Sequence, residues 1–348
     1  MDQRTHSWIA IRAIALFEDT NDQDNLVRLL KPHARKASVG AWIPDQVDAK
    51  RGGAGSSTDN HIFKMEPYKG TQRERFITKR DELLSHLGNH RQTARFLQDH
   101  RASLPDKWWA EPYKGDVKKP GQHLPNRAMA LSITLKDLLL MGDPKVDHLI
   151  PGDVRFAQYM DPEARTREEA AAMYFFMLSH FLADVSMPFH CDGRKLAGYD
   201  EGLHKELEDF WSRRVGTGFE KKNLLQDTSN LTPAQALADN NQVLNQARDL
   251  DAKFGLKFGM AAIPDLLPKH DVWLEVMHLC RASFAVASIA APYEQYPYDD
   301  PQARAPFDTV LGGQNQKLLD SMTQAVLHDA VLNTAIVWKH IWHKVAEE

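Results

Sequence analysis

The chain has 348 residues, 43% of them hydrophobic, which is enough for one large domain or two ordinary ones. Its formal net charge is −4 with charges of both signs interspersed, so the composition gives no sign of a face that binds polyanions. The only two cysteines, Cys191 and Cys280, exclude a disulfide framework and allow either one bridge or two free thiols.

The start of the chain carries no secretory signal, because MDQRTH leads directly into an amphipathic pattern. No apolar run reaches the ~18 residues of a membrane-spanning helix. We therefore expect a cytoplasmic protein without a transmembrane segment. If the chain had been trimmed to a mature start, it would instead be secreted.

Helices are predicted wherever apolar residues recur at helical spacing. The first follows Thr5, which is the expected N-cap. The others are expected at Asn25–Ala41, Gln72–His100, Leu124–Met141, Thr166–Met187, Glu201–Val215, Asn241–Phe254, His270–Ala291 and Leu311–Lys344. Loops are expected at Trp42–Asn60, Ala102–His123 and Pro292–Pro306, where proline and glycine interrupt the pattern.

Almost no segment alternates with the period of two that is typical of a strand. We therefore predict an all-α fold, a single multi-helix domain over residues 1–348 with long loops. The pentapeptide EPYKG occurs twice, at Glu66–Gly70 and Glu111–Gly115. A chance recurrence of turn residues is the simpler interpretation, and two loops beside a substrate site is the alternative.

Two carboxylate–imidazole pairs at helical spacing lie within thirty residues of each other, His180/Asp184 and His204/Glu208, with His190 between them. Side chains four residues apart lie on the same face of a helix, so each pair can converge on one point. Imidazole nitrogen and carboxylate oxygen suit zinc. One such pair alone would usually be a surface hydrogen bond, but two pairs with a fifth candidate ligand favour a metal site.

The surroundings of the first pair strengthen this interpretation. Residues 170–189 read AAAMYFFMLSHFLADVSMPF, so His180 and Asp184 are expected on a buried helix. A buried carboxylate needs a compensating partner, and a metal ion is one of the few adequate ones. Asp45 after Pro44, His61 after a glycine-rich tract, and His6 in the first turn are weaker candidates on their own.

Taken in order, these residues resemble the zinc-dependent phospholipase C / S1–P1 nuclease superfamily. The matching pattern is Met1, His6, Pro44-Asp45, His61, His180-x3-Asp184-x5-His190 and His204-x3-Glu208. The resemblance covers Met1 to about Trp211 and implies an all-α hydrolase with two or three zinc ions.

The resemblance also implies which residues hold each ion. The first zinc would be held by Asp45, His61, His180 and Asp184, and the second by His190, His204 and Glu208. The third would be held by Met1, His6 and a bridging Asp184. Asp45 would orient or deprotonate the attacking water, and Glu208 would help to stabilise the leaving oxygen.

The third set uses a terminal α-amine, which the family normally provides through a tryptophan exposed by signal cleavage. Here Met1 stands at the nuclease spacing before His6, and Asp2 is not a small residue, so removal of Met1 is not expected. The sequence therefore predicts that the initiator methionine supplies this ligand.

The substrate is the less determined part of the prediction. Glu208 and the His190–His204 spacing match the phospholipase branch, whereas the N-terminal spacing matches the nuclease branch. Neither branch's known substrate pocket is preserved, because Ile62 and Lys64 follow His61 and Arg4 replaces an acid. Aromatic candidates for substrate contact, which could equally be packing residues, are Phe63, Tyr68, Trp108, Trp109 and Tyr113.

The sequence thus predicts a zinc-dependent phosphodiesterase of phospholipase C type, acting on a small phosphorylated or lipid substrate. A single-strand nuclease or 3′-nucleotidase is the less favoured alternative, so nucleic acid is the second choice of partner. A metalloenzyme acting on another small substrate and a zinc-stabilised binding module are further alternatives. Oligomeric state is not predicted.

Overall fold

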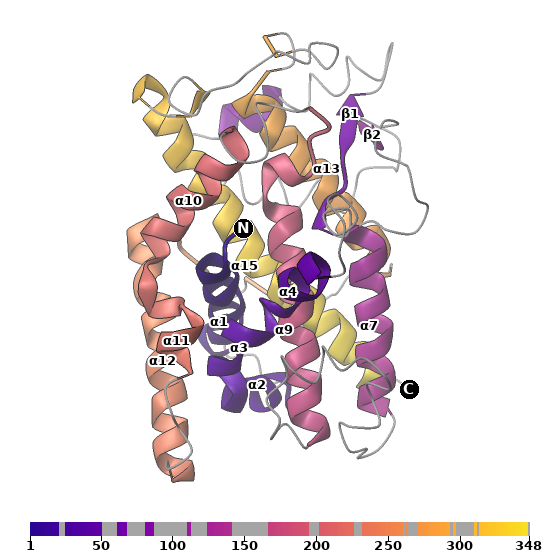
Figure 1. Ribbon diagram of the computed structural model, residues 1–348, viewed down its shortest axis with the longest axis vertical. Helices are drawn as coiled ribbons and strands as arrows, with labels where there is room; N and C mark the ends of the chain where they lie inside the picture. Colours follow the sequence, from indigo (N-terminus) through magenta and orange to yellow (C-terminus); the bar gives the residue numbers. More distant parts are fainter. Residues whose placement is uncertain are drawn as a thin grey trace.

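The computed structural model describes residues 1–20, 25–50, 61–67, 81–86, 110–112, 124–140, 166–194, 202–225, 232–259, 262–263, 271–292, 295–296, 310–311 and 313–346. Within these ranges the regular structure is helical apart from two three-residue strands, which confirms the all-α prediction (Figure 1). The assignment of residues 1–348 to a single domain stays a prediction.

Four helices that bury most of their residues form the centre of the fold. They are α1 (Gln3–Asp19), α9 (Arg167–Ser186), α13 (Val272–Ala290) and α15 (Gln316–Ala346). Trp338 of α15 packs against Phe175 and Phe176 of α9. Outer helices α7 (Leu124–Leu140) and α12 (Pro233–Phe254) pack on this core, and Trp8 Nε1 of α1 donates to Ala247 O at 3.1 Å.

Helix starts follow local capping chemistry. The Thr166 side chain accepts from the Glu169 backbone N–H at the start of α9, and Asp271 caps α13 in the same way through Leu274. Thr232 and Gln235 form a reciprocal capping box before α12. That box explains why α12 begins at Pro233, eight residues before the predicted start at Asn241.

Three predictions near the N-terminus are wrong. The N-cap of α1 is Asp2 and not Thr5. The predicted helix Asn25–Ala41 is divided into α2 (Asn25–Leu30), the 3-10 helix η1 (Lys31–Lys36) and α3 (Ala37–Gly40), because Pro32 lacks the N–H that a continuous α-helix needs.

The loop predicted from Trp42 begins instead with a helix, α4 (Ile43–Lys50). Pro44 stands in its first turn, where a missing N–H costs nothing. The remainder of that predicted loop, residues 51–60, lies outside the described residues.

The second half of the chain matches the predicted helices closely. The structure has η4 (Pro188–His190), α10 (Leu203–Val215), η5 (Thr217–Phe219), α11 (Lys221–Leu224) and η6 (Gly313–Asn315) between the longer helices.

Cys191 and Cys280 are both free and buried. By length and composition α13 could span a membrane, but 89% of its apolar stretch is buried in the protein, as in a core helix.

The two EPYKG copies begin in paired strands, β1 (Met65–Pro67) and β2 (Ala110–Pro112). They run antiparallel with Glu66 opposite Glu111, so the first residues of the two copies pair with each other. On its other side β1 contacts the segment after α9, where Met65 N donates to Cys191 O at 3.0 Å. Most of the predicted helix Gln72–His100, and the remainder of Ala102–His123 and Pro292–Pro306 apart from short described pieces, lie outside the described residues.

Candidate metal centre

The buried helix α9 provides the middle of the site. His180 and Asp184 lie one turn apart on it, with His180 Nε2 3.0 Å from Asp184 Oδ2, and both side chains are almost completely buried. The local sequence is apolar on every side, so the protein core surrounds this one polar pair. The predicted convergence of the pair is therefore present.

The orientation of His180 is set by a backbone carbonyl. Its Nδ1 lies 2.7 Å from the oxygen of Ala41, at the end of α3, so Nδ1 carries the proton and Nε2 faces the site. This arrangement is typical of a metal-ligating histidine, in which the second ring nitrogen is held by an oxygen. Gly40 allows the Ala41 carbonyl to come this close to His180, because α3 approaches Phe176 of α9 too closely for a side chain at residue 40.

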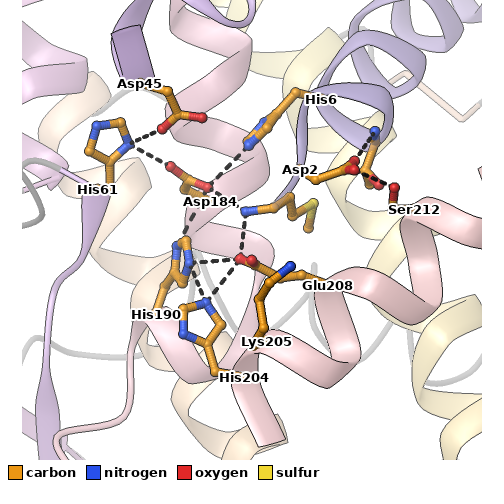
Figure 2. Close-up of polar contacts among 12 residues, drawn as sticks. Asp2, His6, Asp45, His61, Asp184, His190, His204, Lys205, Glu208 and Ser212 are labelled. Carbon is orange, nitrogen blue, oxygen red and sulfur yellow. Dashed lines mark hydrogen bonds and ion pairs between the residues drawn. The ribbon is translucent and has the colours of Figure 1, made fainter. Parts of the chain in front are cut away.

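The first predicted ligand group comes together around one oxygen of Asp184. His61 Nδ1 lies 2.9 Å from Asp184 Oδ2 and 2.8 Å from His180 Nε2. Asp45 Oδ1, from the first turn of α4, lies 3.7 Å from His61 Nδ1 and 3.5 Å from His180 Nε2. Figure 2 shows Asp45, His61 and Asp184 converging from three separate segments.

The other oxygen of Asp184 faces a second set of groups. Asp184 Oδ1 lies 3.1 Å from the α-amine of Met1, 3.4 Å from His6 Nε2 and 3.5 Å from His190 Nδ1. Figure 1 places the chain's first residue beside α10, in the interior of the helical bundle. Asp184 therefore divides its two oxygens between two neighbouring groups of donors.

The last predicted group is built by η4 and α10. Pro188 starts the 3-10 turn that directs His190 toward α10. His190 Nε2 lies 2.9 Å from His204 Nε2 and 3.3 Å from Glu208 Oε1, while His204 Nε2 lies 2.9 Å from Glu208 Oε1. Glu208 Oε1 also lies 2.8 Å from the α-amine of Met1, which joins this group to the previous one.

The charges at the centre perturb one another strongly. Burial alone would lower the pKa of the Met1 α-amine, but the charges of Glu208 and Asp184 outweigh it and raise that pKa to about 11. Burial would likewise raise the pKa of Asp184, yet electrostatic interactions with the His180 imidazole and the α-amine hold it well below its usual range. The pKa of Glu208 is also held well below its usual range, because the α-amine overrides its burial. Both carboxylates are therefore ionised.

The imidazoles of His6 and His190 are neutral. Burial, reinforced by the electrostatic effect of the neighbouring His180 imidazole, lowers the pKa of His6 to about 4. Burial also lowers the pKa of His190 to about 3, although Asp184 acts in the opposite direction. A neutral imidazole has a free lone pair, which is the form that binds a metal ion.

These residues fit a metal ion by their unsatisfied atoms. Both ring nitrogens of His6, and Nδ1 of His190, are buried without a hydrogen-bond partner in the described part of the chain. Donor atoms of the His61, His180 and Asp184 group are 2.8–3.0 Å apart. Donor atoms around a tetrahedral zinc ion stand ~3.4 Å apart, so these side chains would move slightly apart to hold the ion. Buried His/Asp/Glu groups of this spacing could hold metal ions.

All nine predicted ligands thus lie in one connected cluster. Phe63, a predicted substrate contact, is buried in the apolar core, and its backbone N–H donates to His190 O. Tyr68, Trp108, Trp109 and Tyr113 lie outside the described residues. Sequence reasoning missed the Ala41 carbonyl, because no pattern reveals which backbone oxygen a side chain will meet.

Sequence reasoning also missed a contact between Asp2 and Ser212, whose side chains are hydrogen-bonded to each other. The N-cap role of Asp2 was open to prediction from its residue type, but its partner Ser212 lies 210 residues away.

Comparison of the chain with models of protein families, with curated proteins and with solved structures finds no match.

Proposed function

We propose that this chain is a zinc-dependent hydrolase of phosphate esters, with a fold and metal centre of the phospholipase C / P1 nuclease type, and most favourably a phosphodiesterase. The observation that carries the proposal is the divided contact of Asp184. Its Oδ2 faces His61 and His180, and its Oδ1 faces the Met1 α-amine and His190. A carboxylate that divides its two oxygens between two adjacent groups of donors suits a bridge between metal ions.

The ligand groups would be those described above, namely Asp45, His61, His180 and Asp184; His190, His204 and Glu208; and Met1, His6 and Asp184. Zinc at such sites lowers the pKa of water and neutralises the charge that develops on a phosphate ester. The remaining steps belong to the side chains of this chain.

Asp45 is the best-placed proton acceptor. Its side chain is 38% exposed, whereas His180 beside it is completely buried, so Asp45 faces both the cluster and solvent. In hydrolysis a water oxygen attacks phosphorus, the P–O bond to the leaving group breaks, and the proton of the water passes to the Asp45 carboxylate. Asp45 can return that proton to solvent.

Glu208 has a different role from that of a general acid. Its pKa is held well below the usual range by the neighbouring α-amine and by a hydrogen bond with His190, so it has no proton to give. The departing oxygen therefore takes its proton from solvent, on the side where His204 is 25% exposed. Glu208 acts by holding Met1 and the two histidines in place.

A phosphodiester without a base-specific contact fits the surroundings better than nucleic acid does. Lys64, three residues after His61, donates from Nζ to Phe189 O at 2.7 Å, so part of its hydrogen-bonding capacity serves the protein itself. The net charge of −4 also disfavours a polyanionic strand.

The test is a substrate panel with zinc-loaded and chelator-treated protein. Bis(p-nitrophenyl) phosphate, phosphatidylcholine vesicles and single-stranded DNA would each be assayed. We expect hydrolysis of the first two, its loss on chelation and its return with zinc. Asp209→Asn is the matched control, because Asp209 follows Glu208 on α10 and pairs with Lys205 outside the cluster. Zinc binding with no hydrolysis of any substrate would favour a binding module instead.

A further inference from the structure

The α-amine of Met1 lies between carboxylates of two helices, yet a chain terminus stays in place only when something fixes it. Met1 N is 3.1 Å from Asp184 Oδ1 on α9 and 2.8 Å from Glu208 Oε1 on α10. The next residue, Asp2, makes a separate set of contacts that holds this terminus.

One half of these contacts fixes the start of α1. Asp2 Oδ1 accepts hydrogen bonds from the backbone N–H groups of Arg4 at 3.0 Å and Thr5 at 3.3 Å. The Asp2 carbonyl accepts from the N–H of His6 at 3.1 Å. The cap therefore sets the first turn of the helix, which carries the His6 ring toward Asp184.

The other half reaches across to α10. Asp2 Oδ2 accepts a hydrogen bond from the hydroxyl of Ser212, a buried residue one helical turn after Glu208. Residues four apart share a helix face, so Glu208 holds the amine of Met1 while Ser212 holds the side chain of Asp2. Figure 2 shows Glu208 and Ser212 on α10, with Asp2 beside Ser212.

The helix that receives the terminus is itself held in place. Trp211, next to Ser212, donates from Nε1 to Thr323 Oγ1 of α15 at 3.0 Å. Arg4 pairs with Glu220 at 2.7 Å, which gives α1 a further connection to the segment after α10. Because α10 is held in this way, the hydroxyl of Ser212 has a defined position and can hold the Asp2 side chain in place.

We propose that Asp2 and Ser212 form a clamp that positions the Met1 α-amine and the His6 ring at the metal centre. Aspartate suits this task because it has two acceptor oxygens and no donor, so it can cap a helix with one and bind a hydroxyl with the other. Ser and Thr cap helices equally well but offer a single oxygen. The role of the clamp at a metal centre rests on the proposed function, whereas the contacts of Asp2 and Ser212 are present without any bound metal.

The test measures the α-amine directly in metal-free protein. The amine is completely buried, so acetylation by an N-hydroxysuccinimide ester, followed by mass spectrometry of the N-terminal peptide, should be slow. Ser212→Ala leaves the cap and every predicted ligand in place. We expect it to raise the acetylation rate about tenfold, the effect of losing one hydrogen bond to a charged group. Acetylation of Ser212→Ala at the parental rate would overturn the clamp.

Three further variants separate the clamp from a general loss of stability. Ser212→Thr keeps the hydroxyl and should restore slow acetylation. Ser288→Ala removes a buried hydroxyl whose bond stays within α13, at Phe284 O, and should leave the rate unchanged. Asp2→Asn keeps an oxygen for the cap but removes the charged acceptor, and should raise the rate less than Ser212→Ala does. Equal acceleration by Ser288→Ala and Ser212→Ala would also overturn the clamp.

Zinc affinity, measured by competition with a chromophoric chelator, separates this inference from the proposed function. We expect Ser212→Ala to weaken the weakest site about tenfold. A parent protein that binds no zinc would refute the proposed function, while the acetylation rates would still decide the clamp. A parent that binds zinc, together with unchanged acetylation of Ser212→Ala, would refute the clamp alone.

Discussion

At the scale of single residues, the site depends on how each carboxylate is shared. Asp184 uses both oxygens, one toward His61 and one toward the Met1 amine, whereas Glu208 presents Oε1 to His190, His204 and that amine. Asp184 is also the more deeply buried, with 2% of its side chain exposed against 15% for Glu208. The two carboxylates are therefore expected to differ in importance.

Asp184→Asn should reduce the turnover number of phosphodiester hydrolysis more than Glu208→Gln does. Loss of the shared carboxylate disturbs both donor groups, so we expect a decrease of more than about a hundredfold, against about tenfold for Glu208→Gln. Steady-state kinetics at saturating zinc would measure both, with Asp209→Asn near parental activity. Parental turnover in both variants would show that the site assignment is wrong.

The α-amine of Met1 gives a second residue-scale prediction. An N-terminal extension turns this amine into an amide, whose nitrogen is a poor metal ligand, and it adds chain where Met1 is only 7% exposed. A tag left on the N-terminus should lower zinc stoichiometry and turnover, whereas a tag after the C-terminus should not. Equal zinc content and turnover in the two tagged proteins would leave Met1 without a role as a ligand.

At the scale of elements, the close approach of α3 to α9 holds His180, a candidate ligand. A Cβ added at Gly40 would lie 2.5 Å from Phe176 Cβ, and the next residue, Ala41, holds the His180 ring through its carbonyl. Separation of the two helices would therefore move a ligand as well as weaken the core.

Gly40→Ala should destabilise the protein by about 1–3 kcal/mol, as overpacking of a buried contact does, and should also weaken zinc binding. Gly218→Ala is the matched control, since a Cβ there meets nothing within 4 Å. Urea unfolding of the two variants would measure the difference. Equal midpoints and slopes for the two would contradict the account of the α3–α9 contact.

The elements also show what the sequence could and could not reveal. The candidate ligand pairs of α9 and α10 followed from i, i+4 spacing, and α9 also from its continuous apolar pattern, which are local properties. The strands β1 and β2 were missed because three residues are too few to show a period, and their pairing joins segments 45 residues apart. The division of Asn25–Ala41 was missed although Pro32 marks it, because the apolar spacing continues across it.

At the scale of the whole molecule, the candidate ligands come from α1, α4, α9, η4, α10 and the segment at His61, so bound ions would connect segments that lie far apart in the sequence. The ionised carboxylates of Asp184 and Glu208 lie 3.1 Å and 2.8 Å from the buried Met1 amine. Bound metal ions would compensate the negative charges of these carboxylates. Metal binding and stability should therefore be coupled.

Removal of zinc by a chelator should lower the melting temperature, and added zinc should restore it. Free zinc at a hundred times the dissociation constant would contribute about 2.7 kcal/mol per site. Differential scanning calorimetry across a zinc titration would measure this, with Asp184→Asn as the variant that responds least. An identical melting temperature with and without zinc would contradict the coupling.

The central claim, a multi-zinc centre that hydrolyses phosphate esters, is tested most directly by titrating zinc into metal-free protein while following bis(p-nitrophenyl) phosphate hydrolysis. Elemental analysis of the same samples would give the zinc bound per chain. The account predicts negligible turnover without zinc and activity that rises to a plateau once two or three zinc ions are bound. Full activity in the metal-free protein, or a fully loaded protein with no hydrolysis, would contradict it.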